Sequence, residues 1–311
     1  MRGRSARPFR RSLWKLAARI VCGSRRAHFH SWLPSLSVQQ LASGAPGIKT
    51  VSFRGRPVLQ TFPVADLRER AGETIHIIGS GPSIRDNDLS QIGKREAILL
   101  NGAISLLRGT IDEPLAIMIE DERFVWRHFD LMREVMAADI PCLFSLGVIR
   151  ALCEIDIDWL QMRPVFLLDD LRKPYGRPRR SAAELGALAE VRYDTETGAG
   201  ISFAPDIGTF SGGSVAVTAI QIAIACAPRL IGLFGIDISN ANAPRFYERE
   251  ADTASSGIAE AEARILSHFA LAREICEESG ISLLCFSRVS ALLGVGIRYD
   301  DRFARKDEDV G

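Results

Sequence analysis

The feature of this chain that most constrains its fold is a series of short apolar runs, each ending at a polar or glycine residue. The runs lie at 74–78, 97–100, 115–119, 141–146, 164–168, 230–234 and 281–286. Short apolar runs bounded by turn signals are typical of strands buried on both faces of a parallel sheet. Helical patterns lie between several of them, at 124–138, 215–225 and 258–279. Strands alternating with helices predict an α/β fold: a Rossmann-like, mostly parallel sheet with helices on both faces.

Composition divides the rest of the chain. Residues 1–45 form a basic arm and linker, residues 46–301 the α/β domain, and residues 302–311 a charged tail. Within the domain, the stretch 172–206 opens with basic residues, Gly and Pro, which predicts a loop or lid rather than core. The formal net charge of the whole chain is only +1. We therefore expect no nucleic acid among its partners.

The basic arm carries nine Arg and Lys residues in its first 29 positions, and no Asp or Glu precedes Asp66. Apolar residues such as Phe9, Leu13 and Ile20 are interleaved with these cations. This pattern predicts a cationic amphipathic helix that can lie on an anionic membrane surface. The plain alternative is a disordered basic tail. No apolar run is long enough to predict a helix that crosses a bilayer.

The cysteines give no sign of a metal site, and the acidic pairs, which could hold a divalent ion, lack a metal-binding motif. The six cysteines include no C-x-x-C pair, and most lie in apolar stretches, as reduced core cysteines do. We therefore expect a reducing compartment. The pairs Glu120-Asp121 and Asp169-Asp170 follow predicted strands, but neither has the spacing of an Asp-x-Asp motif. We expect no metal and no cofactor.

Polar and glycine residues gather where the predicted strands end, which is where parallel α/β sheets bind ligands. The loop after the first strand consists of Gly79, Ser80, Gly81, Pro82 and Ser83. Its N–H groups and hydroxyls suit a phosphate, because glycine permits close approach of the backbone. The alternative is a plain tight turn. Asn101 ends the next strand, where its amide suits a base or a sugar hydroxyl unless it only forms an Asx-turn.

A second glycine-rich segment precedes the apolar helix at 215–225. It consists of Ser211, Gly212, Gly213 and Ser214. The positive N-terminus of the helix and the capping hydroxyl suit a phosphate or carboxylate. The alternative is ordinary N-capping with close packing of helix on sheet.

Asp237 follows the strand at 230–234, and a polar loop then carries Arg245, Tyr247 and Glu248. Arg245 or Tyr247 is suited to hold a phosphate, and Glu248 to act as a base. A solvated surface position is the alternative for each of them. His268 lies near the apolar stripe of the helix at 258–279, where a histidine is more often structural.

Taken together, the order of these motifs resembles that of the CMP-sugar glycosyltransferases. Residues 77–83 with Asn101-Gly102, then 210–214, then 235–237, follow the order found in the bacterial family 42 sialyltransferases. Residues 211–225 and 235–237, with the Pro-Arg-Phe-Tyr-Glu segment at 244–248, are more similar to the lipopolysaccharide-core Kdo transferases. The resemblance spans roughly 74–297 and implies a GT-A-like variant of the Rossmann-like fold.

The resemblance also implies a chemistry. The donor would be a CMP-activated 2-keto sugar acid, Kdo or a sialic-acid-like sugar, and the acceptor a lipid-linked or lipopolysaccharide-core glycan. Ser80 and Ser83 would contact the phosphate or ribose of CMP, Asn101 the nucleotide, and Asp237 the cytidine region. Ser211, Gly212 and Gly213 would line the donor pocket. Such an enzyme would be cytoplasmic and peripheral on the inner membrane.

The resemblance does not identify the base. The sialyltransferases have Asn in place of Ser80, and their catalytic His has no clear counterpart in this chain. Glu248, Glu260 and His268 are the candidates for the base, while Asp121 is placed among the donor-binding residues and stays open as a base.

Two other functions fit parts of the pattern. A pterin-type pyrophosphokinase carries a similar Gly-Pro-Ser loop and would use ATP and Mg²⁺, with Asp121 and Asp169-Asp170 as ligands. A non-catalytic nucleotide-binding accessory protein of glycan assembly is the third possibility.

Overall fold

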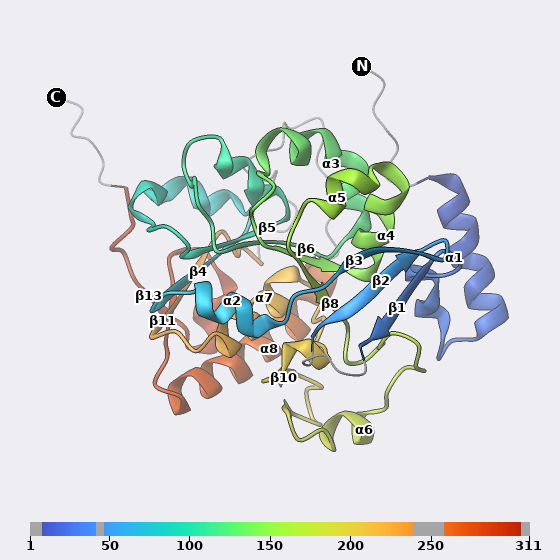
Figure 1. Ribbon diagram of the computed structural model, residues 1–311. Coiled ribbons are helices and arrows are strands. Elements are labelled where there is room, and N and C mark those ends of the chain that lie inside the picture. The colour runs from blue at the N-terminus through green and yellow to red at the C-terminus, as the bar shows by residue number, and fades with distance from the viewer. Residues whose placement is uncertain (1–7, 42–46, 239–257, 306–311) are drawn as a thin grey trace.

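The computed structural model describes residues 8–41, 47–238 and 258–305, with side chains in the last stretch described from residue 261. Its centre is an eight-stranded sheet in the order β13-β12-β11-β4-β5-β6-β7-β8 (Figure 1). Every neighbouring pair in this sheet is parallel. The strands are β4 (Thr74–Ile78), β5 (Ala97–Leu100), β6 (Ala116–Ile119), β7 (Cys142–Ser145), β8 (Val165–Leu168), β11 (Leu230–Phe234), β12 (Ser282–Cys285) and β13 (Arg298–Tyr299). The predicted α/β class is confirmed.

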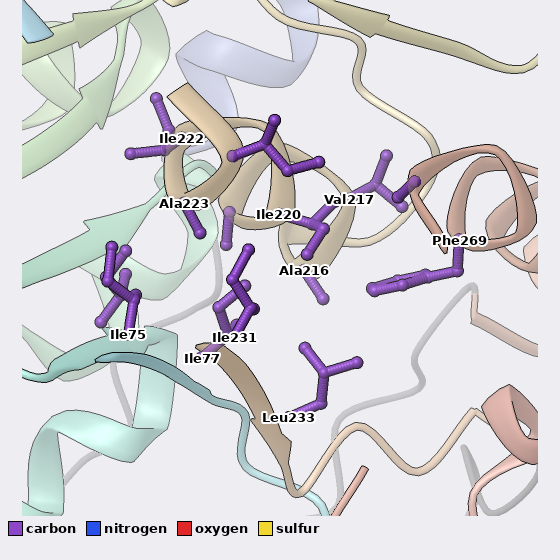
Figure 2. Close-up of a cluster of buried hydrophobic side chains, with 14 of the residues drawn as sticks. Ile75, Ile77, Ala216, Val217, Ile220, Ile222, Ala223, Ile231, Leu233 and Phe269 are labelled. Carbon is purple, nitrogen blue, oxygen red and sulfur yellow. The ribbon is translucent and has the colours of Figure 1, made fainter. Parts of the chain in front are cut away.

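Helices cover both faces of this sheet. They are α2 (Val64–Arg70), α3 (Glu122–Val135), α4 (Leu146–Ile155), α5 (Ile157–Gln161), α7 (Val215–Ala225) and α8 (Ile258–Glu278). On one face Ile75, Ile77 and Leu233 pack under α7, with Phe269 of α8 beside them (Figure 2). The opposite face buries a second cluster together with α3 and α4. Burial on both faces explains why the strands are continuous apolar runs instead of alternating ones.

The order of the strands fixes where a ligand would bind. From β4 the chain adds β5 to β8 on one side, and it later adds β11 to β13 on the other. Because all these strands are parallel, their carboxyl ends meet at one edge of the sheet, which we call the carboxyl edge. The order reverses between β4 and β11, and ligands of such sheets bind at this edge near the reversal.

The region before the main sheet forms a small sheet of its own. β1 (Leu36–Gln40), β2 (Lys49–Phe53) and β3 (Arg56–Gln60) pair as an antiparallel meander. Before them lie α1 (Phe9–Cys22) and the 3₁₀ helix η1 (Ala27–Ser31). The end of the predicted arm therefore pairs with the beginning of the predicted domain through β1 and β2.

The stretch 172–206 contains regular structure. α6 (Ala182–Gly186) is followed by β9 (Val191–Tyr193), which pairs antiparallel with β10 (Gly200–Ser202). A Cβ at Gly200 would lie 2.5 Å from the ring of Phe210, so this position requires glycine. Movement of the stretch as a lid remains a prediction.

The described residues include no helix long and apolar enough to cross a bilayer. All six cysteines are free, and five of them are buried. Burial raises the pKa of Cys142 and Cys226 to about 12, so both thiols are protonated at neutral pH.

Candidate functional site

Most of the predicted site residues that the structure describes fall into two groups at the carboxyl edge, and contacts add Glu120 and Thr218 to one of them. The loop pair consists of residues 79–83 after β4 and residues 235–237 after β11. The α7 cluster consists of Asn101 after β5, Glu120 after β6, Thr218 in α7, and residues 211–214 before α7. Both groups are rich in glycine and serine, but they differ in the hydrogen-bond partners of their polar side chains.

The loop pair is joined by hydrogen bonds. The N–H of Gly81 donates to the carbonyl oxygen of Gly235 at 2.9 Å. The carboxylate of Asp237 accepts from the N–H of Ser83 at 2.8 Å and from its hydroxyl at 2.6 Å. The hydroxyl of Ser287, after β12, donates to the same carboxylate at 3.0 Å. Ser83 and Asp237 are therefore partners of each other across the strand reversal.

The glycines of the loop pair are required by this close contact. A Cβ at Gly79 would lie 2.4 Å from the carbonyl oxygen of Gly235, and a Cβ at Gly81 would lie 2.4 Å from Oδ2 of Asp237. Real Cβ contacts do not come this close, so both positions exclude a side chain. The Gly-Ser-Gly-Pro-Ser pattern is thus explained by packing of one loop on another, and donor contacts at Ser80, Pro82, Ser83 and Asp237 remain predictions.

The amino-terminal end of α7 has the features of an anion site. The hydroxyl of Ser214 caps the helix by accepting from the N–H of Ala216 at 3.3 Å. Ser211 and Gly213, just before it, are exposed. The guanidinium of Arg264 in α8 donates to the carbonyl oxygen of Gly212 at 2.9 Å. A cation beside the positive end of a helix favours a phosphate or carboxylate.

Glu120 connects this end of α7 to β6. The hydroxyl of Thr218, in the first turn of α7, donates to its carboxylate at 2.6 Å. Burial raises the pKa of Glu120 to about 7, the hydrogen bond from Thr218 lowers it, and the nearby carboxylates of Asp170 and Asp121 raise it further. A carboxyl group with this pKa exchanges protons at neutral pH and is suited to general acid–base catalysis.

The neighbouring Asp121 is differently placed. Its carboxylate accepts from the N–H of Arg123 at 2.8 Å, which caps α3, and it also pairs with the guanidinium of Arg123. Asp121 therefore bonds at the start of α3, whereas Glu120 bonds to α7. Asp121 as a donor contact remains a prediction.

Asn101 combines an uncommon backbone conformation with an unsatisfied side-chain atom. Its φ is +47°, in the left-handed region that few residues other than glycine adopt. Its Oδ1 is buried and has no hydrogen-bond partner. An unsatisfied buried acceptor at the end of a central strand marks a position where a ligand can supply the missing donor.

The acidic pair after β8 is held by local backbone groups. Asp169 accepts from the N–H of Tyr175 at 3.0 Å, and Asp170 from that of Arg172 at 2.8 Å. Burial raises the pKa of Asp169 to about 6. Across the described parts of the chain, no three His, Cys, Asp or Glu side chains gather into a group that could hold a metal ion.

His268 is fully buried under the segment before α7. Its Nδ1 lies 2.9 Å from the carbonyl oxygen of Gly200, its Nε2 has no partner, and burial lowers its pKa to about 4. A Cβ at Gly212 would lie 2.8 Å from its ring, which explains that glycine by packing. A catalytic role for His268 remains a prediction.

Several predicted site residues lie outside the part of the chain that can be described. Arg245, Tyr247 and Glu248 fall within 239–257, and the side chain of Glu260 is also outside it. Two residues that the sequence did not single out, Glu120 as an acid–base group and Arg264 beside Gly212, enter the site through contacts between distant segments.

A cavity of about 540 Å³ lies away from this edge, between the turn joining β2 to β3 and helices α4 and α5. It is lined by Phe53, Arg54, Arg56, Pro57, Val58, Cys153, Ile157 and Gln161. None of these residues belongs to the loop pair or to the α7 cluster.

No protein-family description and no curated protein matches this chain. The solved structures similar to it include two of the sialyltransferase CstII from Campylobacter jejuni. The structure with the substrate analogue CMP-3FNeuAc has 13% identity and a TM-score of 0.39, covering 75% of this chain and 88% of that one. The structure with cytidine-5'-monophosphate has 14% identity and a TM-score of 0.32, covering 76% and 91%. Similarity at this level carries no argument about activity.

Proposed function

We propose that this chain is a glycosyltransferase that moves a sugar acid from a CMP-activated donor to a hydroxyl of a surface glycan. The observation that carries the proposal is the hydrogen bond between Thr218 and Glu120. It holds an acid–base group with a pKa of about 7 beside the amino-terminal end of α7, which is suited to an anion. Transfer of a sugar from a nucleotide requires both features, a site for the phosphate and a base for the acceptor.

The α7 cluster supplies the groups that such a donor needs. The helix N-terminus, the hydroxyl of Ser211 and the guanidinium of Arg264 would hold the phosphate of CMP. Asn101 would use its unsatisfied Oδ1 to accept a hydrogen bond from the cytosine amino group or a ribose hydroxyl. Preorganised donors of this kind can stabilise a departing phosphate by a few kcal/mol.

Glu120 would act as the base. As the bond from the sugar carbon to the CMP phosphate breaks, the acceptor oxygen bonds to that carbon and its proton passes to the carboxylate of Glu120. CMP leaves with the bonding electron pair, which the α7 terminus and Arg264 stabilise. A positioned base typically contributes about 10²- to 10⁴-fold to the rate. Glu248, Glu260 and His268 remain the other candidates for this role.

The motif resemblance favours a 2-keto sugar acid, Kdo or sialic acid, as the group transferred, and a lipopolysaccharide core or related glycan as the acceptor. The pyrophosphokinase alternative would use Asp121, Asp169 and Asp170 as Mg²⁺ ligands. Because these carboxylates already accept from backbone N–H groups nearby, the geometry gives that alternative no specific support.

The test is CMP release from CMP-Kdo and from CMP-sialic acid in the presence of lipopolysaccharide-core acceptors. Thermal stabilisation by CMP, CDP and ATP, each with and without Mg²⁺, runs beside it. We expect CMP and CDP to stabilise the protein and one of the two donors to be consumed. Stabilisation only by ATP with Mg²⁺ would support the pyrophosphokinase instead, and no response to any nucleotide would end the transferase proposal.

Two variants test the pocket assignment. Ser211→Ala and Asn101→Ala should each weaken donor binding by about tenfold, the loss of a hydrogen bond worth roughly 1.4 kcal/mol. The matched control is Ser279→Ala, an exposed serine between α8 and β12 at the opposite edge of the sheet. Unchanged donor affinity in both pocket variants would remove the assignment.

A further inference from the structure

Helix α1 is attached to the protein on the side that carries Arg11 and Ala18. Its buried residues are Arg11 and Ala18, which lie two turns apart on one side of the helix. The guanidinium of Arg11 donates to the carbonyl oxygen of His30 at 2.7 Å and lies 3.8 Å from the carboxylate of Glu122. Glu122 also pairs with the fully buried Arg150 of α4. This buried ionic cluster fixes which face of α1 is turned inward.

The opposite face of α1 is apolar and has no partner among the described residues. Phe9, Leu13, Leu16 and Ile20 follow the spacing of a single helical stripe. Their exposed fractions are 75%, 51%, 58% and 74%. A surface helix ordinarily turns such a stripe toward the core. A stripe of this kind turned to solvent marks an interaction surface.

Cations border this stripe. Arg10, Lys15 and Arg19 are exposed on α1, and the exposed Arg25 and Arg26 follow it. With no acidic residue before Asp66, nothing in this part of the sequence offsets them. An anionic bilayer complements both features, because acyl chains accept the stripe and headgroup phosphates attract the cations. A second copy of the helix would instead bring like charges together.

We propose that α1 docks this chain on an anionic lipid bilayer, with its apolar stripe at the boundary between headgroups and acyl chains. In this arrangement residues 9, 13, 16 and 20 enter the bilayer, while Arg11 and Ala18 contact the rest of the protein. The sequence alone predicts an amphipathic helix but not which of its faces is free.

The attachment of α1 lies near segments of the candidate site. Glu122, which pairs with Arg11, lies two positions beyond Glu120. The carbonyl oxygen of Arg25 accepts from the N–H of Arg179, in the segment that follows β8. Both contacts are made to segments that leave the carboxyl edge. A lipid-linked acceptor would therefore reach that edge from the docked surface, a consequence that rests on the proposed transferase function.

The experiment is co-sedimentation of the full chain with vesicles of phosphatidylcholine alone and of phosphatidylcholine mixed with phosphatidylglycerol. We expect binding to the mixed vesicles that weakens as salt is raised. Lys15→Gln combined with Arg19→Gln should lower the partition coefficient about 25-fold, since each basic side chain near the surface contributes roughly fivefold. Leu13→Glu combined with Ile20→Glu should lower it by more than about tenfold.

Matched controls change exposed residues at the opposite edge of the sheet. Lys94→Gln with Arg229→Gln removes two cations whose side chains are 82% and 81% exposed. Met162→Glu alters an apolar residue that is 61% exposed. Both controls should bind vesicles as the wild type does. Equal binding by the stripe variant and the wild type would overturn the proposal, as would a stripe variant that only lowers the oligomeric mass.

The outcome is independent of the transferase proposal, because vesicle binding needs no donor. If vesicles bind but no nucleotide stabilises the protein, docking stands and the transferase proposal fails. If CMP stabilises the protein but the stripe variant still binds vesicles normally, docking fails and the transferase proposal stands.

Discussion

The loop pair and the α7 cluster lie at the same edge of the same sheet, yet their polar side chains differ in the partners that they already have. In the loop pair, Ser83 donates two hydrogen bonds to the carboxylate of Asp237, and the hydroxyl of Ser287 donates a third. In the α7 cluster, Asn101 keeps a buried oxygen without a partner, and Glu120 has its charged form disfavoured by burial. Unsatisfied or strained polar groups therefore identify the better candidate site, whereas glycine and serine content alone does not.

The largest effect is expected at Glu120. In Glu120→Gln the base is lost while the amide keeps the shape of the side chain, so the transfer rate should fall about 10²- to 10⁴-fold. Donor affinity should change little, because Glu120 acts on the acceptor. The measurement is the steady-state rate of CMP release with saturating donor. A rate within a few-fold of the wild type would move the base to Glu248, Glu260 or His268.

The same variant has a consequence for stability. Because the folded pKa of Glu120 is raised from 4.5 to about 7, its contribution to stability is complete below pH 4.5 and is lost as the pH rises through 7. Relative to Glu120→Gln, the wild type should thus lose unfolding free energy over this range, by up to about 3 kcal/mol. Parallel pH profiles of the two proteins in urea unfolding would contradict the pKa shift.

A substitution in the loop pair should mainly lower the free energy of unfolding. In Gly81→Ala the new Cβ meets the carboxylate of Asp237 and the carbonyl oxygen of Gly235, 2.4 and 2.7 Å away. We expect a loss of more than about 2 kcal/mol in the free energy of unfolding, measured by urea denaturation. Gly72→Ala is the matched control, because no atom lies within 4 Å of its Cβ position. A neutral Gly81→Ala would mean that the two loops can separate.

The fold could be predicted from the sequence because a parallel strand that is buried on both faces has a continuous apolar sequence. The predicted bounds 74–78, 97–100 and 230–234 match β4, β5 and β11. Where the apolar run included a flanking residue, as at 115–119, the observed strand is shorter by that residue. Regular structure within 172–206 was harder to predict, because its strands are short and its core is small.

The site was only partly predictable for a different physical reason. Asn101 was found from its residue type at a strand end. The importance of Glu120 depends on Thr218, 98 positions later, and that of Arg264 on Gly212, 52 positions earlier. A single sequence gives the residue types at these positions, but not the burial that raises the pKa of Glu120 or the contact that places Arg264 beside a helix terminus.

Asp237→Asn tests whether the loop pair is only a structural junction. The amide keeps one acceptor and replaces the other with a donor, so either the N–H of Ser83 or the hydroxyls of Ser83 and Ser287 lose their acceptor. The cost should be about 1–3 kcal/mol in unfolding free energy. If the loop pair is structural, the folded variant should bind CMP as the wild type does in isothermal titration. A loss of CMP affinity beyond tenfold with stability unchanged would instead assign Asp237 to the donor.

The smallest expected effect is at Thr218, whose hydroxyl adjusts the pKa of Glu120. Thr218→Val keeps the shape of a fully buried side chain but removes the hydroxyl that donates to Glu120. Because that hydrogen bond lowers the pKa of Glu120, its loss should raise the pKa. The ascending limb of the pH–rate profile should then move to higher pH, with stability lowered by only about 1 kcal/mol.

Thr110→Val, in the turn before β6, is the control and should leave the limb in place. An unmoved limb in Thr218→Val would show that the group titrating in catalysis is not Glu120, because no other candidate base contacts this hydroxyl among the described residues.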